Sequence, residues 1–526
     1  MIPAAAGRKG EPDLNDIAVQ FRHVSMAFPG VLANDDVSLD IRKGEVFALV
    51  GENGAGKSTL MNILYGIHTP TGGSVSIRGE EVSRFSPRNA IDHGVGMVHQ
   101  HFMLVPSFTV AQNIVMSREP RRFGIFFDQR AAERETRRLV EEYGLTVDPN
   151  AVVAETGVGL QQRVEILKTL YRGAEILILD EPTAVLTPQE TDKLFAVLRS
   201  MRDDGKAIVI ITHKMHEVET LSDRVAVLRH GQFVGDMLTK DTNAQEMTNM
   251  MVGHAVTLNI ARPDPVDPKP RIEVKNLTVR SIDGIVKLDD VSFTANSGEI
   301  LGIAGISGCG QKELLEAIAG LQPTENGSIC YVEDDGTREE LLGKDPLSIA
   351  EMGVALSFVP EDRLGMGLVG NMDLSDNMML RSFRKGRGIL TDRKSPRKLA
   401  ETVVEELDVN TPGVTTPVRR LSGGNVQKVL VGREIASSPT VFMAAYPVRG
   451  LDINSSYLIY NLLNEQKEKG VAVIFVGEDL DVLLELCDRI LVINSGKITG
   501  LVDARTSTKE ELGLLMTKTD GGETHE

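Results

Sequence analysis

The sequence is poor in the residues that mark secreted and membrane-spanning proteins. Its 526 residues include no tryptophan and only three cysteines, Cys309, Cys330 and Cys487, which lie too far apart for a metal-binding spacing and indicate free thiols in a reducing compartment. No apolar run approaches the roughly 20 residues that cross a bilayer. The N-terminal segment lacks the apolar core of a signal peptide. These absences predict a soluble, cytoplasmic protein that meets a membrane only through a partner.

Basic residues are also comparatively scarce. The chain has 57 lysines and arginines against 74 aspartates and glutamates, which gives a formal net charge of −17. Because phosphate backbones select basic surfaces, this balance argues against nucleic acid as the main partner. Hydrophobic residues make up 41% of the chain, which is enough for well-filled cores. A chain of this length favours roughly two to four domains.

An internal repeat divides the sequence. Residues 35–77 align without a gap to residues 289–331, which lie 254 positions later. Between the copies, residues 261–270 carry four prolines, whose spacing favours an extended, semi-rigid linker over a packed element. We therefore predict five segments: a flexible tail at 1–16, a first domain at 17–254, a linker at 255–270, a second domain at 271–518 and a flexible tail at 519–526.

Each half alternates short apolar runs with amphipathic helical stretches, which predicts an α/β fold around a largely parallel sheet. In the first half, residues 46–50, 176–179 and 207–211 are apolar runs typical of buried strands. The chemistry of such sheets gathers at the carboxyl ends of the strands. We therefore expect functional residues directly after these three runs.

A glycine-rich segment follows the first of these strands. Residues 51–58 read Gly-Glu-Asn-Gly-Ala-Gly-Lys-Ser, and a helix is expected from Lys57 to Tyr65. Glycine-rich turns let backbone N–H groups converge on phosphate oxygens, while Lys57 supplies a positive charge and Ser58 a hydroxyl for Mg²⁺. The predicted nucleotide-binding residues of this loop are Gly51, Asn53, Gly54, Gly56, Lys57, Ser58 and Thr59.

Four further residues follow strand-like segments in the order that phosphoryl transfer requires. Gln100 could contact both the metal and the attacking water, and Asp180 could hold hydrated Mg²⁺ together with Ser58. Glu181 can orient and deprotonate water, and His213 ends the next strand within reach of the γ-phosphate. The predicted catalytic residues are therefore Glu181, His213 and Gln100, and the predicted Mg²⁺ ligands are Ser58, Gln100 and Asp180.

An aromatic residue precedes the first of these strands. Phe28 could stack on adenine, but an aromatic side chain at this place is nearly as often part of the core. Both interpretations stay open at this point.

Two short motifs connect these residues to a known family. Leu421–Asn425 (Leu-Ser-Gly-Gly-Asn) and its counterpart at residues 156–162 resemble the signature motifs of ABC ATPases. The resemblance covers nearly the whole chain and is closest to the tandem ATP-binding subunits of bacterial importers for simple sugars and nucleosides. It implies two ABC-type P-loop ATPase domains, each with a mainly parallel core sheet, an antiparallel β part and a helical subdomain. Residues 100–106, 161–166 and 180–188 resemble the nucleoside branch.

The resemblance also implies composite sites, in which the phosphate loop of one domain faces the signature of the other. Site one would combine the first-half residues above with four from the second half: Ser422, Gly423, Gly424 and Asp452. Site two would have lost its chemistry. Gln311 and Lys312 replace the loop lysine and hydroxyl, Ala445 and Tyr446 replace the Asp-Glu pair, and Glu361 and Glu478 replace the glutamine and histidine. Its signature is weakened as well, by Gly157 and Thr187.

These implications define an expected function. The chain is expected to be the ATP- and Mg²⁺-dependent energising subunit of an ABC importer, peripheral on the cytoplasmic face of the cell membrane. Its expected partners are two transmembrane permease subunits, docked through residues 101–120 and 362–380, and an extracellular substrate-binding lipoprotein. Nucleosides are the first expectation for the cargo and simple sugars such as ribose or galactose the second. The alternative of another class is a ribosome-associated tandem ABC protein, but such proteins usually keep both sites and a long charged linker.

Overall fold

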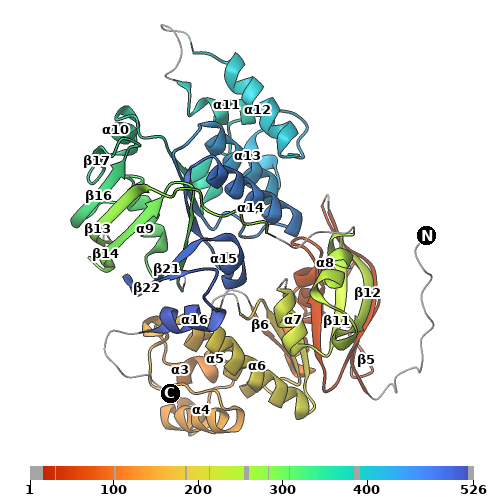
Figure 1. Cartoon of the computed structure of the whole chain (residues 1–526). Coiled ribbons are helices and arrows are strands. Elements are labelled where there is room, and N and C mark those ends of the chain that lie inside the picture. The colour runs from red at the N-terminus through yellow and green to blue at the C-terminus, as the bar shows by residue number, and fades with distance from the viewer. Residues whose placement is uncertain are drawn as a thin grey trace. The chain divides into compact units, whose positions relative to one another are not determined.

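The chain forms two compact units, Met1–Thr257 and Leu258–Glu526. The computed structural model describes residues 16–29, 31–99, 102–183, 186–212, 214–253, 260–281, 284–306, 308–383 and 391–518. Figure 1 shows both units, the first coloured from red to yellow-green and the second from green to blue. The predicted tails at 1–16 and 519–526 fall outside the described residues, apart from Asp16.

The first unit contains two main sheets. An antiparallel sheet has the strand order β2 (Val31–Arg42), β1 (Ile17–Phe28), β4 (Gly72–Ile77), β5 (Glu80–Glu81). The core sheet has the order β12 (Gln232–Leu238), β11 (Arg224–Arg229), β3 (Val46–Val50), β10 (Ala207–Ile211), β9 (Ile176–Asp180), β6 (Val95–Val98). All neighbours in the core sheet are parallel except β11 and β12.

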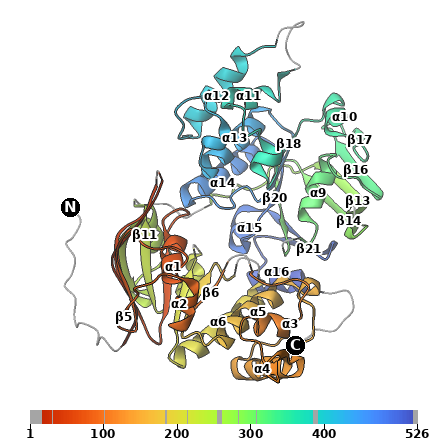
Figure 2. The same cartoon turned by 180° about the vertical axis from the view of Figure 1, so that it is seen from behind.

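Helices cover this sheet and build a separate helical part. The first group is α1 (Lys57–Leu64), α2 (Pro87–Asp92), α6 (Pro188–Asp203), α7 (Met215–Leu221) and α8 (Ala244–Val252). The helical part comprises α3 (Val110–Ile114), α4 (Gln129–Tyr143) and α5 (Val158–Tyr171), which lie together in Figures 1 and 2, with the short hairpin β7 (Arg121–Arg122) and β8 (Phe126–Phe127) before α4.

The second unit repeats this architecture. Its antiparallel sheet has the order β14 (Val286–Asn296), β13 (Pro270–Arg280), β16 (Asn326–Val332), β17 (Arg338–Glu340). Its core sheet has the order β18 (Leu356–Val359), β19 (Val441–Ala445), β20 (Ala472–Val476), β15 (Ile300–Ala304), β21 (Arg489–Asn494), β22 (Lys497–Asp503). Its helices are α9 (Gln311–Ile318), α10 (Pro346–Glu351), α11 (Leu374–Met379), α12 (Lys394–Glu406), α13 (Gly423–Ala436), α14 (Ile453–Glu468), α15 (Leu480–Leu486) and α16 (Lys509–Thr517).

Burial explains why the core strands are apolar throughout. Both faces of a parallel sheet are covered, so its strands bury every side chain and show no alternation. β3 and β10 are buried at all five positions. One hydrophobic cluster joins the antiparallel sheet, α1 and one face of the core sheet in the first unit, and includes Phe21, Leu60 and Ile178. The sequence prediction of a mainly parallel α/β core with an antiparallel β part and a helical part in each half is confirmed.

The proline-rich segment lies against the second unit. Residues 260–269 form no helix or strand, and Pro270 begins β13. Ile260 is buried in the second unit's core, and the Asn464 amide donates to the carbonyl of Ala261 at 2.9 Å. The Arg262 guanidinium donates to the carbonyl of Leu484 at 2.9 Å. The described part of the linker therefore forms no helix or strand and packs against the second unit, whereas the sequence favoured an extended linker over a packed element.

Candidate functional site

The fold brings three of the predicted motifs to one edge of the first unit's core sheet. β3, β10 and β9 are neighbours and run parallel, so the loop after β3 lies beside the carboxyl ends of the other two. The loop closes with Gly56 at a φ of 95°, where a Cβ would lie 2.3 Å from the carbonyl oxygen of Ala33. Only glycine fits both that conformation and that close approach. Buried Asn34 donates its side-chain amide to the Gly56 carbonyl at 3.2 Å and fixes the turn.

Lys57 begins α1 and is almost fully buried. Its Nζ donates to the carbonyls of Gly51 and Glu52 at 2.7 and 2.9 Å, so the side chain folds back along the loop. Burial lowers the pKa of Lys57, while the carboxylates of Glu181, Asp180 and Glu52 act in the opposite direction. A partly desolvated cation held by weakly accepting carbonyls is suited to exchange those partners for phosphate oxygens.

Ser58 and Asp180 meet at the next position. The Ser58 hydroxyl donates to a carboxylate oxygen of Asp180 at 3.2 Å. Desolvation raises the pKa of Asp180, and the Ser58 hydrogen bond acts against this. A hydroxyl and a carboxylate side by side at the phosphate loop are oxygen donors of the kind that Mg²⁺ prefers, so the residues present fit the predicted metal.

Glu181 follows Asp180 in an unusual backbone conformation. Its φ is 49°, and its N–H donates to the carbonyl of Ile211 at 2.9 Å, which ties the end of β9 to the end of β10. A non-glycine residue in the left-handed region costs free energy and is held there by its surroundings. This turn places the carboxylate of the candidate general base next to the candidate metal ligand.

A buried polar network supports these strand ends. Glu217, on α7, is 6% exposed and accepts hydrogen bonds from the hydroxyls of Thr183 and, at 3.1 Å, Thr212. Lys214 pairs with the same carboxylate at 3.3 Å. A glutamate on the buried face of a short helix is the only sequence signal for this network, and it does not indicate the partners. The network holds the segments on both sides of the candidate site.

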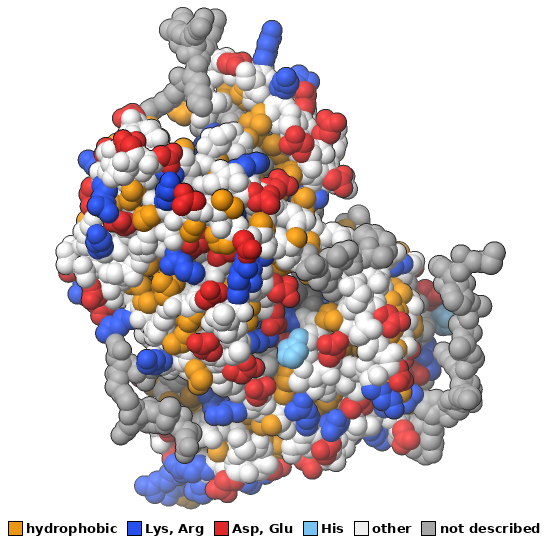
Figure 3. Space-filling view, viewed as in Figure 1, with side chains coloured by type: hydrophobic (Ala, Val, Ile, Leu, Met, Phe, Trp, Pro, Cys, Tyr) orange, Lys and Arg blue, Asp and Glu red, His pale blue; other side chains and the backbone are white. Residues whose placement is uncertain are grey.

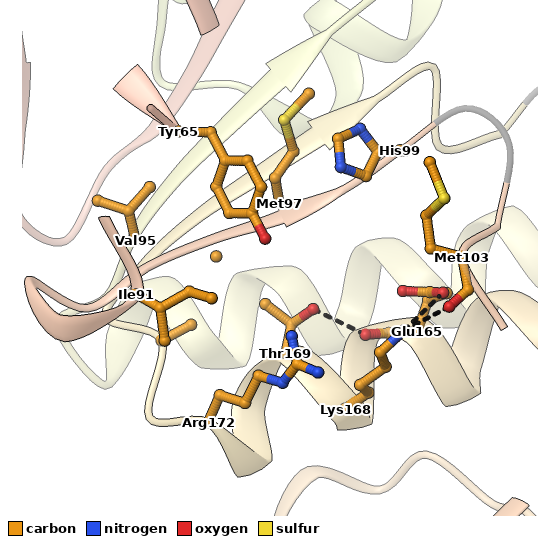
Figure 4. A pocket seen from close by; sticks show the side chains of 12 residues that line it. Tyr65, Ile91, Val95, Met97, His99, Met103, Glu165, Lys168, Thr169 and Arg172 are labelled. Carbon is orange, nitrogen blue, oxygen red and sulfur yellow. Dashed lines mark hydrogen bonds and ion pairs between the residues drawn. The ribbon is translucent and has the colours of Figure 1, made fainter. Parts of the chain in front are cut away.

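Two predicted residues, Gln100 and His213, lie outside the described residues. Their neighbours are described. A cavity of about 90 Å³ beside His99 is lined by residues from α5, β6 and the end of α1, and Figure 4 shows the side chains that line it. Lys168 crosses this region, pairs with Glu165 at 3.2 Å and donates to the carbonyl of Met103 at 2.6 Å. The Lys168 hydrogen bond to Met103 anchors the segment that follows position 100.

The other predicted loop residues are accessible to a ligand. Asn53 and Gly54 are exposed, and Thr59 is half-buried on α1. Phe28 ends β1, is 37% exposed and meets His68 edge-on at a centroid distance of 5.4 Å. The Phe28 ring is thus no core residue, which leaves its predicted stacking role open.

The second unit brings its predicted signature residues together. Ser422 caps the N-terminus of α13, where its side chain accepts from the Asn425 N–H. Gly423 and Gly424 form the first turn, and a Cβ on Gly424 would lie 3.5 Å from the Asp452 carboxylate. Asp452 caps α14 and accepts from the N–H and hydroxyl of Ser455. Exposed glycine N–H groups at a helix start form a surface that suits anions.

The first unit's counterpart differs as predicted from its sequence. Gly157 stands at the cap position of α5 without a side-chain cap. Thr187 caps α6 and forms a capping box with Glu190. A Cβ on Gly159 would lie only 2.4 Å from a carboxylate oxygen of Glu190. The carboxylate beside these glycines therefore comes from Glu190, a residue that the sequence analysis did not single out.

The second unit's strand ends carry different chemistry. Gln311 takes the place of Lys57 and donates to the carbonyl of Ile306 at 3.0 Å. Ala445 and Tyr446 occupy the positions of Asp180 and Glu181. The positions of the Thr183, Thr212 and Glu217 network are filled by Val448, Gly477 and Val482.

Charges of both signs are interspersed over the face of the molecule seen in Figure 3, so basic side chains do not dominate that face. No helix among the described residues is long and apolar enough to span a bilayer.

Comparison with known proteins identifies the family. A family model described as ABC transporter matches residues 34–184 and 288–447. The guanosine import ATP-binding protein NupO of Bacillus subtilis is 41% identical, over 95% of this chain and 97% of NupO. The glucose import ATP-binding protein TsgD13 of Haloferax volcanii is 40% identical, over 95% of each chain. An archaeal ribosome recycling factor, aABCE1, solved with the ribosomal stalk protein aP1, aligns over 92% of this chain and 90% of its own with a TM-score of 0.59, but at 16% identity this shows the fold alone.

These similarities extend over nearly the full length of the curated relatives and include both halves of the repeat. The resemblance that the signature motifs indicated is thereby confirmed. The chain belongs to the ABC transporter family, as a tandem ATP-binding protein, and hence a translocating ATPase, of the nucleoside and simple-sugar importer type.

Proposed function

We propose that this ATPase energises nucleoside import by hydrolysing Mg²⁺-ATP with the residues of its first unit. The observation that carries the proposal is the contact of Ser58 with Asp180 at 3.2 Å, next to Glu181 and the glycine loop. Such a set positions phosphates, neutralises charge and orients water. The corresponding positions in the second unit, Lys312, Ala445 and Tyr446, provide neither the metal-binding oxygens nor a base.

Each of the first unit's site residues would have a separate role in ATP hydrolysis. Lys57 exchanges its carbonyl partners for phosphate oxygens, and the loop N–H groups hold the remaining phosphate charge. Ser58, Asp180 and Gln100 would hold Mg²⁺, which supplies charge neutralisation between the terminal phosphates. Glu181 orients and deprotonates the attacking water, and His213 contacts the γ-phosphate. The signature residues Ser422, Gly423 and Gly424, with Asp452, would complete this site when the two halves close on ATP, as the family resemblance implies.

The cargo is proposed from two kinds of similarity. Three segments of the first unit resemble the nucleoside branch. NupO, which is named as a guanosine import ATP-binding protein, is 41% identical. The glucose import protein TsgD13 is 40% identical, so overall identity alone does not separate nucleosides from simple sugars. The segment resemblance makes nucleosides the first choice.

The partners follow from the importer type. Two transmembrane permease subunits would hold the protein at the cytoplasmic face of the membrane, and an extracellular binding lipoprotein would deliver cargo to them. Residues 101–120 and 362–380 are the proposed docking segments, and residue 101 lies outside the described residues. They are connected to the nucleotide side of each unit, since Lys168 anchors Met103 and Arg433 donates to the carbonyl of Gly367 at 2.7 Å.

Purification and uptake together test the proposal. The Glu181→Gln chain, loaded with ATP and Mg²⁺, is purified from detergent-solubilised native membranes, and uptake of labelled guanosine and ribose is measured in cells that carry Lys57→Ala. We expect polytopic membrane proteins to co-purify and guanosine uptake to be lost, while Gln311→Ala retains it. Loss of ribose uptake alone would reassign the cargo to sugars. Co-purification of ribosomal proteins without membrane partners would favour the ribosome-associated alternative instead.

A further inference from the structure

The described residues of the second unit's phosphate loop share two backbone features with the first unit's loop. Gly308 and Gly310 have φ angles of 88° and 108°, against 83° and 95° for Gly54 and Gly56. A Cβ on Gly310 would lie 2.6 Å from the carbonyl oxygen of Lys287, which is the same kind of close approach. A loop of this conformation points successive N–H groups at one place, and such groups bind phosphate without any side chain. The part of the site that depends on backbone alone is therefore retained.

The side chains of this loop lack the positive charge. Gln311 is 2% exposed, and its amide donates to the carbonyl of Ile306. Lys312, the next residue, lies 3.7 Å from Glu316 along α9. The neutral Gln311 thus takes the loop position from which Lys57 serves the terminal phosphates in the first unit.

A cluster of charges occupies the place of the hydrolytic residues. Arg449 pairs with Glu478 at 3.1 Å and with Glu361, and its guanidinium lies 5.8 Å from the ring centroid of Tyr446. Arg363 donates to the backbone carbonyl of Arg449 and holds this turn. Two carboxylates therefore share one arginine side chain, and we name Arg449, Glu361 and Glu478 the carboxylate clamp.

The position of the clamp follows from the sheet. Glu361, Tyr446 and Glu478 come shortly after β18, β19 and β20, which are adjacent parallel strands next to β15, the strand that leads into the loop. Tyr446 is buried in the hydrophobic cluster against which Cys309, a loop residue, also packs. Burial raises the pKa of the Tyr446 hydroxyl, and the charges of Glu478 and Glu361 raise this pKa further.

The chemistry of this cluster opposes a third phosphate. Beyond the backbone cradle, a γ-phosphate would meet two carboxylates whose negative charge the single Arg449 guanidinium offsets only in part, and like charges at close range repel. The Ser58 and Asp180 positions are held by Lys312 and Ala445, so the oxygen pair for Mg²⁺ is replaced. We propose that the second unit's loop binds a nucleoside diphosphate without Mg²⁺ and that the carboxylate clamp discriminates against nucleoside triphosphates. This rests on the proposed function, because it assigns a ligand to the site that the proposal leaves without hydrolysis.

Cys309 provides a probe inside the loop. The full-length chain with Lys57→Ala, which prevents turnover of added ATP, is alkylated with N-ethylmaleimide in the presence of ADP or ATP, with Mg²⁺ or with EDTA. Modification of each cysteine is followed by peptide mass spectrometry. Cys330 lies on β16, where its neighbours are Ser328 and Glu340, and serves as the internal control.

ADP is expected to slow the alkylation of Cys309 equally with Mg²⁺ and with EDTA and to leave Cys330 unchanged. ATP should slow the alkylation of Cys309 to the same extent only at about ten times the concentration of ADP or more. This ratio is expected when roughly 1.5 kcal/mol of charge interaction is lost. With the double substitution Glu361→Gln and Glu478→Gln, the ATP concentration that protects Cys309 should fall close to the protecting concentration of ADP. Its control, Glu485→Gln on α15, should leave the ratio as it is.

The outcomes separate the two proposals. Protection by ATP at the concentration of ADP, dependence on Mg²⁺, or no protection by either nucleotide overturns the diphosphate site. ATP hydrolysis by the unsubstituted chain is measured in parallel. If hydrolysis is present and abolished by Lys57→Ala, the proposed function stands whatever happens at Cys309. If the unsubstituted chain does not hydrolyse ATP, the proposed function fails by itself.

Discussion

Glu181 and Tyr446 occupy equivalent positions and share a backbone conformation, with φ angles of 49° and 48°. Each follows a buried parallel strand, and each donates its N–H to the last residue of the neighbouring strand, Ile211 or Val476, at 2.9 Å. The strained turn that carries the proposed catalytic carboxylate in the first unit thus recurs in the second unit with a tyrosine in its place. The two units share the scaffold at this position but not the side-chain chemistry.

Substitutions of the side chains at these two turns should have unequal effects on ATP hydrolysis. Glu181→Gln keeps the size of the side chain but removes the base, so kcat for ATP hydrolysis should fall by about 10²–10⁴ while ATP remains bound. Tyr446→Phe should leave kcat within about twofold, because no general base is removed. Steady-state hydrolysis and filter binding of labelled ATP measure both. An equal loss in the two variants would remove Glu181 from its proposed role.

The ionised carboxylate of Asp180, a proposed Mg²⁺ ligand, should lower the stability of the folded protein. Desolvation raises its pKa, so the folded protein binds this proton more tightly than the unfolded chain does. The ionised carboxylate therefore opposes folding at pH values above its pKa, and the opposition vanishes as the pH falls below it. Asp180→Asn should raise the thermal midpoint of the first unit near pH 7 and lose this advantage in acid, while abolishing Mg²⁺-dependent hydrolysis. Thermal unfolding followed by circular dichroism at several pH values provides the test, and a lowered midpoint at pH 7 is the contradicting result.

Removal of one partner from the buried pair of Lys168 and Glu165 should destabilise the first unit strongly. Both side chains are less than a tenth exposed, so Lys168→Met leaves a buried carboxylate unpaired, which costs about 3–5 kcal/mol. Adding Glu165→Leu should recover much of this loss. Arg138→Met breaks an exposed pair with Glu142 on α4 and should cost less than about 1 kcal/mol. Urea unfolding measures all four chains, and equal effects of Lys168→Met and Arg138→Met would contradict the assignment.

The signature residues provide a test of which half serves which site. Ser422→Arg in the second unit should abolish the hydrolysis that depends on Lys57 of the first. Gly157→Arg, at the corresponding position of the first unit, should leave hydrolysis nearly unchanged; a Cβ there meets nothing within 4 Å, so the substitution is tolerated. ATPase rates of the two variants are compared at saturating ATP. The reverse pattern would mean that each half completes its own site.

The sequence predicts the parts of this protein that depend on short-range patterns. The phosphate loop, the helix from Lys57 and the buried strands at 176–180 and 207–211 follow from glycine spacing and uninterrupted apolar runs, and the structure contains them. The sequence does not predict the long-range polar contacts. Nothing local to Glu217 indicates that it joins Thr183 to Thr212, and nothing near Arg449 indicates that it joins Glu361 to Glu478. These contacts arise only where parallel strands bring their ends together, so they require the fold.

The packed linker is a second example. Its prolines predict an extended chain, and residues 260–269 form no helix or strand, but whether such a segment packs depends on the residues that it contacts. Lys467 on α14 donates to the carbonyl of Pro263 and also pairs with Asp488 at 2.7 Å, and both charged side chains are buried. The partners of Pro263 lie more than 200 positions away in the sequence, so composition alone could not supply them.

Of the two phosphate loops, the one in the first unit is proposed to support hydrolysis. The most direct measurement is the ATPase rate of purified full-length protein carrying Lys57→Ala or Gln311→Ala, each beside the unsubstituted chain at saturating ATP and Mg²⁺. We predict that Lys57→Ala retains less than about a tenth of the activity, since removal of a charged hydrogen-bond donor costs roughly 1.5–3 kcal/mol, and that Gln311→Ala retains most of it. Substantial hydrolysis by the Lys57→Ala protein would contradict the account.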